Sequence, residues 1–167
     1  MIIGKLELDK RFDRITKLDL IKGMERGILR VQSAAKAGCP SHTGELRNSI
    51  MTSVETEGEI VRGVCWSRAE YGMYVEFGTG PVGQKNHEGI SPDVPVSYSQ
   101  KGWMIPGKAM DRTYAESKGL GVVEGKEGEV IGYLTNGQPA RPYLYPALKN
   151  NEKEIIDMIA REVKSQL

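Results

Sequence analysis

Few residues in this chain have the types and spacing that catalysis or metal binding requires. Its two histidines, His42 and His87, suggest acid–base chemistry or metal binding, because such sites commonly use imidazole, but they lie in different loops and have no second His or Cys at ligand spacing. The two cysteines, Cys39 and Cys65, form no Cys-x-x-Cys pair, which disfavours both a zinc site and a disulfide framework. Cys39 also has no neighbouring histidine and asparagine of the kind that activate a cysteine nucleophile. We therefore expect no metal, no cofactor and no catalytic residue.

The glycines around Thr79 suggest a phosphate-binding loop at first sight. A Walker loop needs Lys followed by Ser or Thr directly after its glycines, whereas Pro81-Val82-Gly83 follows here. The pattern instead predicts that Gly78 and Gly80 let the chain leave a short helix sharply.

Glu76 is the most ambiguous charged residue, because it lies between a valine and a phenylalanine. It belongs either to the solvated face of a short helix or to a buried ion pair, for which Arg47 and Arg141 are candidate partners. A different class of function would use Glu76 with His42 or His87 in a small metal-dependent hydrolase or nuclease. That reading stays open as an alternative.

Charge and composition bound the remaining classes. The 167 residues include 23 Lys and Arg against 22 Asp and Glu, a formal net charge of +1. A dedicated nucleic-acid-binding module usually has a basic excess, so this second alternative is disfavoured. The start MIIGKLELDKRF lacks the apolar region of a signal peptide, and no apolar run approaches the roughly 18 residues of a membrane span. We expect a soluble chain, made in a reducing cytoplasm, with one domain over residues 1–167.

The first third of the chain is predicted to be mainly helical. Ile2–Leu8 suits a short strand or an extended arm. From Asp9 to Ala37, apolar residues recur every three or four positions, which predicts an amphipathic helix with a break near Thr16–Asp19. Gly23 and Gly27 should weaken it, since each costs about 1 kcal/mol relative to alanine.

The middle of the chain alternates turn signals with β-branched residues. Thr43 is expected to cap a one-turn helix, because its hydroxyl can accept from free backbone amides. The segments flanking Thr56–Glu59 have strand composition and predict a β-hairpin. In chain order, the expected elements are a helical turn at Gly44–Asn48, strands at Ile50–Glu55 and Ile60–Trp66, and a short helix at Ala69–Phe77 that ends at Gly78.

The stretch Pro81–Gly137 is rich in Gly, Pro and Ser and is expected to be a flexible insert with long loops. Within it, we expect a strand remnant at Trp103–Ile105, a helical turn at Arg112–Glu116 and a strand at Glu129–Leu134. A closing amphipathic helix is predicted over Arg141–Leu167. The expected fold class is α+β, with an antiparallel sheet of about four strands packed by a long N-terminal helix and a C-terminal helix.

Three segments in order carry a family resemblance: PSHTGELRNSI at Pro40–Ile50, AEYGMYVEFGTG at Ala69–Gly80, and GQPARPYLYPAL at Gly137–Leu148. Together they resemble the phage tail-completion and head–tail joining (neck) family, the tail-component proteins typified by gene product ten of a lambda-like phage. Mild departures are Ser41-His42 for Val-Asp, Gly72 for Ala and Tyr143 for Phe. The stretch Pro81–Gly137 is a larger departure, because shorter family members lack it.

The resemblance implies a structural virion protein of a tailed phage, a prophage or a phage-like contractile bacteriocin (tailocin), assembled in the host cytoplasm. It implies a collar ring at the head–tail junction or tail top, of six copies or alternatively twelve. Connector, tail terminator and tail tube proteins would be its neighbours, DNA would pass through the lumen without specific binding, and no membrane would be involved. The residues expected to carry the signature and the assembly contacts are Thr43, Gly44, Leu46, Tyr74, Glu76, Phe77, Gly78, Gly80, Pro139 and Pro142.

Overall fold

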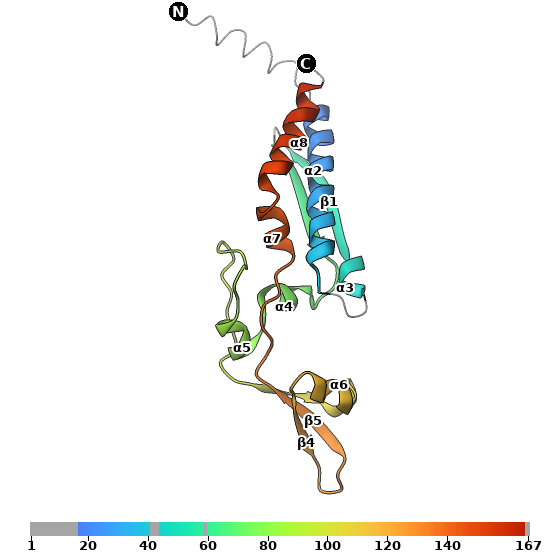
Figure 1. The fold of residues 1–167 in the computed structure, drawn as a ribbon, viewed down its shortest axis with the longest axis vertical. Helices are drawn as coiled ribbons and strands as arrows, with labels where there is room; N and C mark the ends of the chain where they lie inside the picture. Colours follow the sequence, from blue (N-terminus) through green and yellow to red (C-terminus); the bar gives the residue numbers. More distant parts are fainter. Residues whose placement is uncertain (1–16, 41–43, 59, 166–167) are drawn as a thin grey trace, which may run out of the picture. The chain divides into compact units, whose positions relative to one another are not determined.

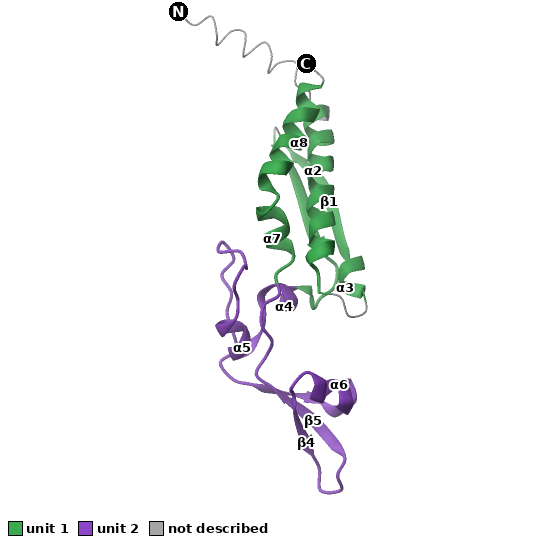
Figure 2. Cartoon of the chain, in the orientation of Figure 1, with its two compact units in different colours: residues 1–72, 142–167 green, residues 73–141 purple. Residues whose placement is uncertain are grey.

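The computed structural model describes residues 17–40, 44–58 and 60–165. Thr43, His42 and the predicted arm at Ile2–Leu8 lie outside the described residues. The chain divides into two compact units (Figure 2): residues 1–72 with 142–167, and residues 73–141. The predicted insert at 81–137 falls within the second unit, and both its flexibility and the expectation of a single domain over 1–167 stay predictions.

The first unit is built around one long helix. Helix α2 (Lys17–Gly38) contacts both strands of a β-hairpin, β1 (Ile50–Glu57) and β2 (Ile60–Ser67). It also contacts α7 (Leu144–Lys149) and α8 (Glu152–Lys164), with which it lies side by side in Figure 1. The one-turn helix α3 (Glu45–Asn48) precedes the hairpin. The predicted hairpin is confirmed, with two antiparallel strands paired from Ile50↔Ser67 to Glu57↔Ile60.

The periodicity of α2 explains the core of this unit. Ile28, Val31 and Ala35 recur at helical spacing and are buried, with Ile50 of β1 fully buried beside the start of the hairpin. The long amphipathic helix is therefore confirmed over the described residues. The predicted break near Thr16–Asp19 is not seen from Lys17 onward, where α2 is already helical.

Two glycines of α2 make possible the close approach of α8. A Cβ atom at Gly23 would lie 3.2 Å from the Cα atom of Ile159, and one at Gly27 would lie 2.9 Å from a side-chain carbon of Ile155. Gly63 likewise allows β2 to approach α2 closely, since a Cβ atom at Gly63 would lie 2.9 Å from the sulfur of Met24. The weakness expected from glycine propensity is thus offset by packing on both sides of α2.

The closing helix is interrupted, which corrects the prediction of a single helix over Arg141–Leu167. Helix α7 ends at Lys149 and α8 begins at Glu152. The side-chain amide of Asn151 donates to the carbonyl of Ala147 at 2.8 Å, so the asparagine satisfies the end of α7. Asparagine competes with helical hydrogen bonds in this way, and the periodicity of the apolar residues alone did not reveal it.

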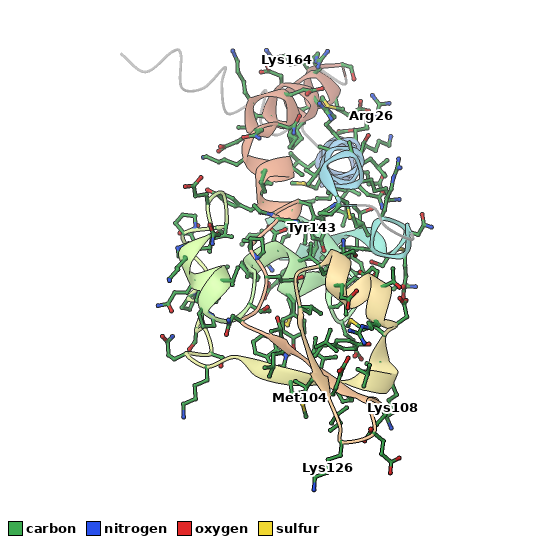
Figure 3. The ribbon with its side chains drawn as sticks, turned by 60° about the horizontal axis from the view of Figure 1, so that its bottom comes forward. Arg26, Met104, Lys108, Lys126, Tyr143 and Lys164 are labelled. Atoms are coloured by element: carbon green, nitrogen blue, oxygen red, sulfur yellow. The ribbon has the colours of Figure 1, made fainter. Side chains whose placement is uncertain are left out.

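The second unit contains a separate sheet. Helices α4 (Gly72–Phe77) and α5 (Gly80–Lys85) come first, followed after a loop by β3 (Trp103–Pro106), the 3-10 turn η1 (Gly107–Ala109) and α6 (Arg112–Ser117). Strands β4 (Gly121–Glu124) and β5 (Val130–Thr135) complete a three-stranded antiparallel sheet in the order β3-β5-β4. Lys126 lies in the turn of the β4–β5 hairpin (Figure 3).

The small core of this unit includes Tyr133 of β5 and Ala115 of α6. Tyr133 is 1% exposed, and its hydroxyl donates to the carbonyl of Met110 at 3.2 Å. Ala115 of α6 is fully buried, and Asp111 caps that helix by accepting from the amide of Tyr114 at 2.8 Å.

The α+β fold class is confirmed, and so are the predicted strand at Trp103, the helical turn at Arg112 and the strand ending the insert. The strands are divided between a two-stranded and a three-stranded sheet rather than gathered in one sheet of about four. Two segments expected to be loops carry regular structure, namely Gly80–Lys85 as α5 and Gly121–Glu124 as β4. The proline at the start of α5 favours a helix and the two valines in β4 favour a strand, but the neighbouring glycines led to the prediction of loops.

Candidate assembly site

Two of the three signature segments meet in the second unit. Thr79 and Gln138, 59 residues apart, form an isolated antiparallel bridge. The amide of Thr79 donates to the carbonyl of Gln138 at 2.9 Å, and the amide of Gln138 donates to the carbonyl of Thr79 at 3.2 Å. We call this bridge and the glycines flanking it, Gly78, Gly80 and Gly137, the neck. The neck joins the two ends of the insert.

Further hydrogen bonds fasten the returning segment to α4 and α5. The side-chain amide of Gln138 donates to the carbonyl of Tyr74 at 2.9 Å, and the amide of Arg141 donates to the carbonyl of Val75 at 2.8 Å. The amide of Ala140 donates to the carbonyl of Asn86 at 2.8 Å. These bonds satisfy carbonyl groups at helix ends, and one of them uses the side chain of Gln138.

Glycine is required at the neck for two reasons. Gly78, Gly80 and Gly137 all have positive φ angles, of 74°, 60° and 95°, which confirms the predicted left-handed cap at Gly78. A Cβ atom would also overlap backbone atoms: the amide of Ala140 at 2.7 Å from Gly78, and the carbonyl of Asn136 at 2.6 Å from Gly80. At Gly137 it would meet the Thr79 carbonyl. The predicted sharp exit from the short helix is confirmed at Gly78, and the structure adds close packing at both glycines of the Gly-Thr-Gly pattern, which the sequence did not predict.

Helix α4 presents side chains of opposite character. Tyr74 and Met73 are 52% and 57% exposed, whereas Glu76 is 4% exposed. The burial of Glu76 therefore excludes the solvated alternative. The ion pair of Glu76 with Arg47 or Arg141 stays a prediction. Phe77 is half-buried, and its carbonyl accepts a hydrogen bond from the hydroxyl of Tyr98 at 2.8 Å, which ties the loop after α5 to the end of α4.

The first signature segment belongs to the first unit, so the neck does not include it. Gly44 occupies the N-cap of α3 with a φ angle of 77°, so the helix begins at Glu45, one residue later than predicted. The predicted cap by Thr43 lies outside the described residues. Leu46 is 5% exposed, and the hydroxyl of Ser49 lies 2.8 Å from that of Ser67, closing the base of the hairpin.

The two signature prolines of the third segment, Pro139 and Pro142, fall on either side of the unit boundary. Pro139 lies in the second unit next to the bridge, and Pro142 starts the return into the first unit, ahead of α7. An assembly role for any of the ten signature residues stays a prediction.

The candidate chemical groups are held in structural contacts. The ring of His87 stacks on Tyr98 with centroids 5.7 Å apart, and its Nδ1 lies 3.3 Å from the carbonyl of Gly83. Burial raises the pKa of the Cys39 thiol, against the opposing charge of Arg47. Burial likewise raises the pKa of Cys65 to about 11. Both thiols are therefore protonated near neutral pH, the opposite of what a cysteine nucleophile needs.

Over residues 17–40, 44–58 and 60–165, no group of three or more His, Cys, Asp or Glu side chains is placed to hold a metal ion. In the same part of the chain, no helix is long and apolar enough to cross a membrane.

Sequence reasoning missed Gly137 as a site residue, because its importance depends on Thr79, 58 positions before it in the chain. The Asn-Gly pair at 136–137 is a turn signal that would have singled it out.

Comparison with known proteins agrees with the resemblance. Residues 6–78 match the model of the HK97-gp10-like family, described as "Bacteriophage HK97-gp10, putative tail-component". The match includes the first signature segment and most of the second, and it ends at Gly78, at the start of the neck. No curated protein and no solved structure matches the chain.

Proposed function

We propose, from the premise that residues 6–78 match a phage tail-component family, that this protein is a ring-forming structural subunit at the head–tail junction or tail top of a tailed phage, prophage or phage-like particle. The family match is the observation that carries the proposal. The Thr79–Gln138 bridge supports the proposal. It pairs the third signature segment with the end of the second, although the third segment lies outside the residues that match the family.

The proposed role is mechanical rather than catalytic. A subunit of this kind closes the end of the tail tube, offers a docking surface to the connector or terminator, and leaves a lumen for DNA. Six copies are preferred, by analogy with tail symmetry, and twelve are the alternative. The near balance of charge fits a lumen that DNA traverses without being gripped.

A ring of six or twelve copies also needs two different faces on each subunit, because such a ring is built from head-to-tail contacts. Exposed apolar side chains are available in both units, including Met73 and Tyr74 on α4 and Ile156 on α8.

The decisive experiment removes the gene from the phage or prophage that encodes it. We expect separate heads and tails in electron micrographs, with complementation by the wild-type chain restoring joined particles. Mass spectrometry of purified particles should detect the protein. Complete, infectious particles without the protein would refute the proposal. An activity assay with added divalent metal, using Glu76→Gln as the control variant, separates the hydrolase alternative from a structural role.

A further inference from the structure

The β-hairpin of the first unit has two long strands with few neighbours. Strands β1 and β2 have eight residues each, and within the described residues each has the other as its one strand neighbour. Helix α2 covers one face, as the close approach of Gly63 to Met24 and Ile28 shows. A helix on one face leaves the strand edges of a two-stranded ribbon without ladder partners, and such edges are templates for another strand.

The register shows which backbone groups face outward at these edges. The amide of Arg68 donates to the carbonyl of Ser49 at 3.0 Å, so every second residue from Ser49 onward forms a hydrogen-bonded pair across the hairpin. The residues between them direct their amide and carbonyl groups away from the partner strand. One of these groups is already used, because the side-chain amide of Gln32 donates to the carbonyl of Ile50 at 2.8 Å. The other outward-facing residues are Thr52, Val54 and Thr56 on β1, and Val61, Gly63, Cys65 and Ser67 on β2.

The charges of the two edges are complementary. Strand β1 carries Glu55 and Glu57 and no basic residue, whereas β2 carries Arg62 and no acidic residue. All three are exposed and lie on the face away from α2, because Val54 and Gly63, which pair with each other, occupy the α2 face. Within one chain, the Nη1 atom of Arg62 lies 3.8 Å from the Oε2 atom of Glu57.

This distribution discriminates between ways of pairing two copies. Joining β1 to β1 about a twofold axis would pair two strands that carry Glu55 and Glu57 and no basic residue, and joining β2 to β2 would pair two strands whose charged residue is Arg62. Like charges across a strand pair are destabilising, and opposite charges stabilise it. Joining β1 of one copy to β2 of the next, in the register that the two strands have within one hairpin, places Arg62 opposite Glu55 of its neighbour and near Glu57.

We infer that the β1 edge of one copy pairs with the β2 edge of the next, so that the hairpins form one continuous antiparallel sheet around the assembly. The inference rests on the proposed ring-forming function and names its subunit contact. The pairing is antiparallel throughout. Strands β1 and β2 are antiparallel within each chain, and rotation about the ring axis keeps equivalent strands in the same direction, so β1 of one copy is also antiparallel to β2 of the next. The two edges differ, so the contact is head-to-tail and can close into a ring. Strands of equal length leave few outward groups unpaired.

Two adjacent residues of β1 provide a matched test. Thr52→Pro removes an amide that faces outward, which edge strands tolerate, whereas Ser53→Pro removes an amide that bonds to Val64 within the hairpin. We expect Thr52→Pro to keep the far-UV circular dichroism and melting temperature near those of the wild type and to lose assembly in light scattering over a concentration series. Ser53→Pro should lower the melting temperature itself. A wild-type chain that stays monomeric at about 1 mM, where even a weak contact of about 4 kcal/mol is half formed, overturns the inference. So does a Thr52→Pro variant that assembles like the wild type.

A charge test covers the case in which Thr52→Pro perturbs packing against α2. Arg62→Glu changes an exposed side chain and should weaken assembly about tenfold. A second variant with Glu55→Arg and Glu57→Arg should be weakened as well. Mixing the two variants restores every contact between neighbours, so we expect assembly to recover in the mixture, and recovery fails if the edges do not meet.

Failure of this inference is distinct from failure of the proposed function. Detection of the chain in purified particles, together with unaffected edge variants, would keep the virion role and refute the edge contact. If the chain forms rings that the edge variants disrupt but is absent from purified particles, the edge contact would be supported and the virion role refuted.

Discussion

Replacing Gly137 by alanine should open the neck. Gly137 has a φ angle of 95°, and a Cβ atom there would overlap the Thr79 carbonyl, which accepts from the amide of Gln138. The left-handed backbone costs a non-glycine residue about 1 to 2 kcal/mol. Displacing Thr79 also weakens both backbone hydrogen bonds of the bridge, at about 1 kcal/mol each. The expected loss of stability in the second unit is therefore about 3 to 4 kcal/mol.

Gly128 provides the matched control. It lies in the turn between β4 and β5 with a φ angle of 83°, and an added Cβ would meet no atom within 4 Å. Gly128→Ala therefore carries only the backbone cost of about 1 to 2 kcal/mol. The difference between the two variants, about 2 kcal/mol, isolates the overlap at the neck.

Native-state hydrogen exchange at the amides of Thr79 and Gln138 measures this difference directly, because both donate across the bridge. We expect exchange to be roughly 30-fold faster in Gly137→Ala than in Gly128→Ala, since each 1.4 kcal/mol corresponds to about a factor of ten. Equal exchange rates in the two variants would refute the argument that close packing at the bridge requires glycine.

Three further predictions concern the first unit. Gly27→Val should lower the stability measured by urea unfolding by about 1 to 3 kcal/mol, because its added carbons overpack the contact with α8; an unchanged midpoint would show that α8 moves away at little cost. Arg26→Ala should lower the stability by about 1 to 2 kcal/mol in the same assay, because the side chain of Glu162, with which Arg26 pairs at 2.5 Å, is only 10% exposed. Lys149→Ala is the control: it breaks an ion pair whose two side chains are both more than half exposed, so the stability should change by no more than about 0.5 kcal/mol. The raised pKa of Cys65, about 11 against an ordinary value of 9.0, means that the unfolded chain ionises first, so stability from this group is intact below pH 9 and falls between pH 9 and 11. Cys65→Ala should flatten that fall in a melting-temperature profile, and an equally steep profile in the variant would contradict the assignment.

The Arg26–Glu162 ion pair joins α2 to α8, and Figure 3 labels Arg26 on α2 and Lys164 at the end of α8. Its value comes from the burial of Glu162, which is 8% exposed as a residue. Nothing in the spacing of charges along α8 distinguishes Glu162 from the exposed glutamates at its start. Packing of α2 against α8 determines that Glu162 is the carboxylate removed from solvent.

The sequence alone determined the features whose free energy depends on close neighbours. Apolar spacing in residues 17–38 specified α2, β-branched residues on either side of a polar turn specified the hairpin, and Gly78 specified the end of α4. Each depends on residues within about two helical turns or one strand pair, so that local propensity and pattern are sufficient.

Only the tertiary structure decided what distant residues do to one another. Gly27 is poor for a helix locally, yet it admits α8, which follows more than 100 residues later in the chain. Glu76 is compatible with a solvated helix face until the surrounding chain buries it. The bridge between Thr79 and Gln138 requires an insert whose two ends return to the same place. Contacts of this kind depend on the packing of the whole unit, and no window of sequence contains both partners.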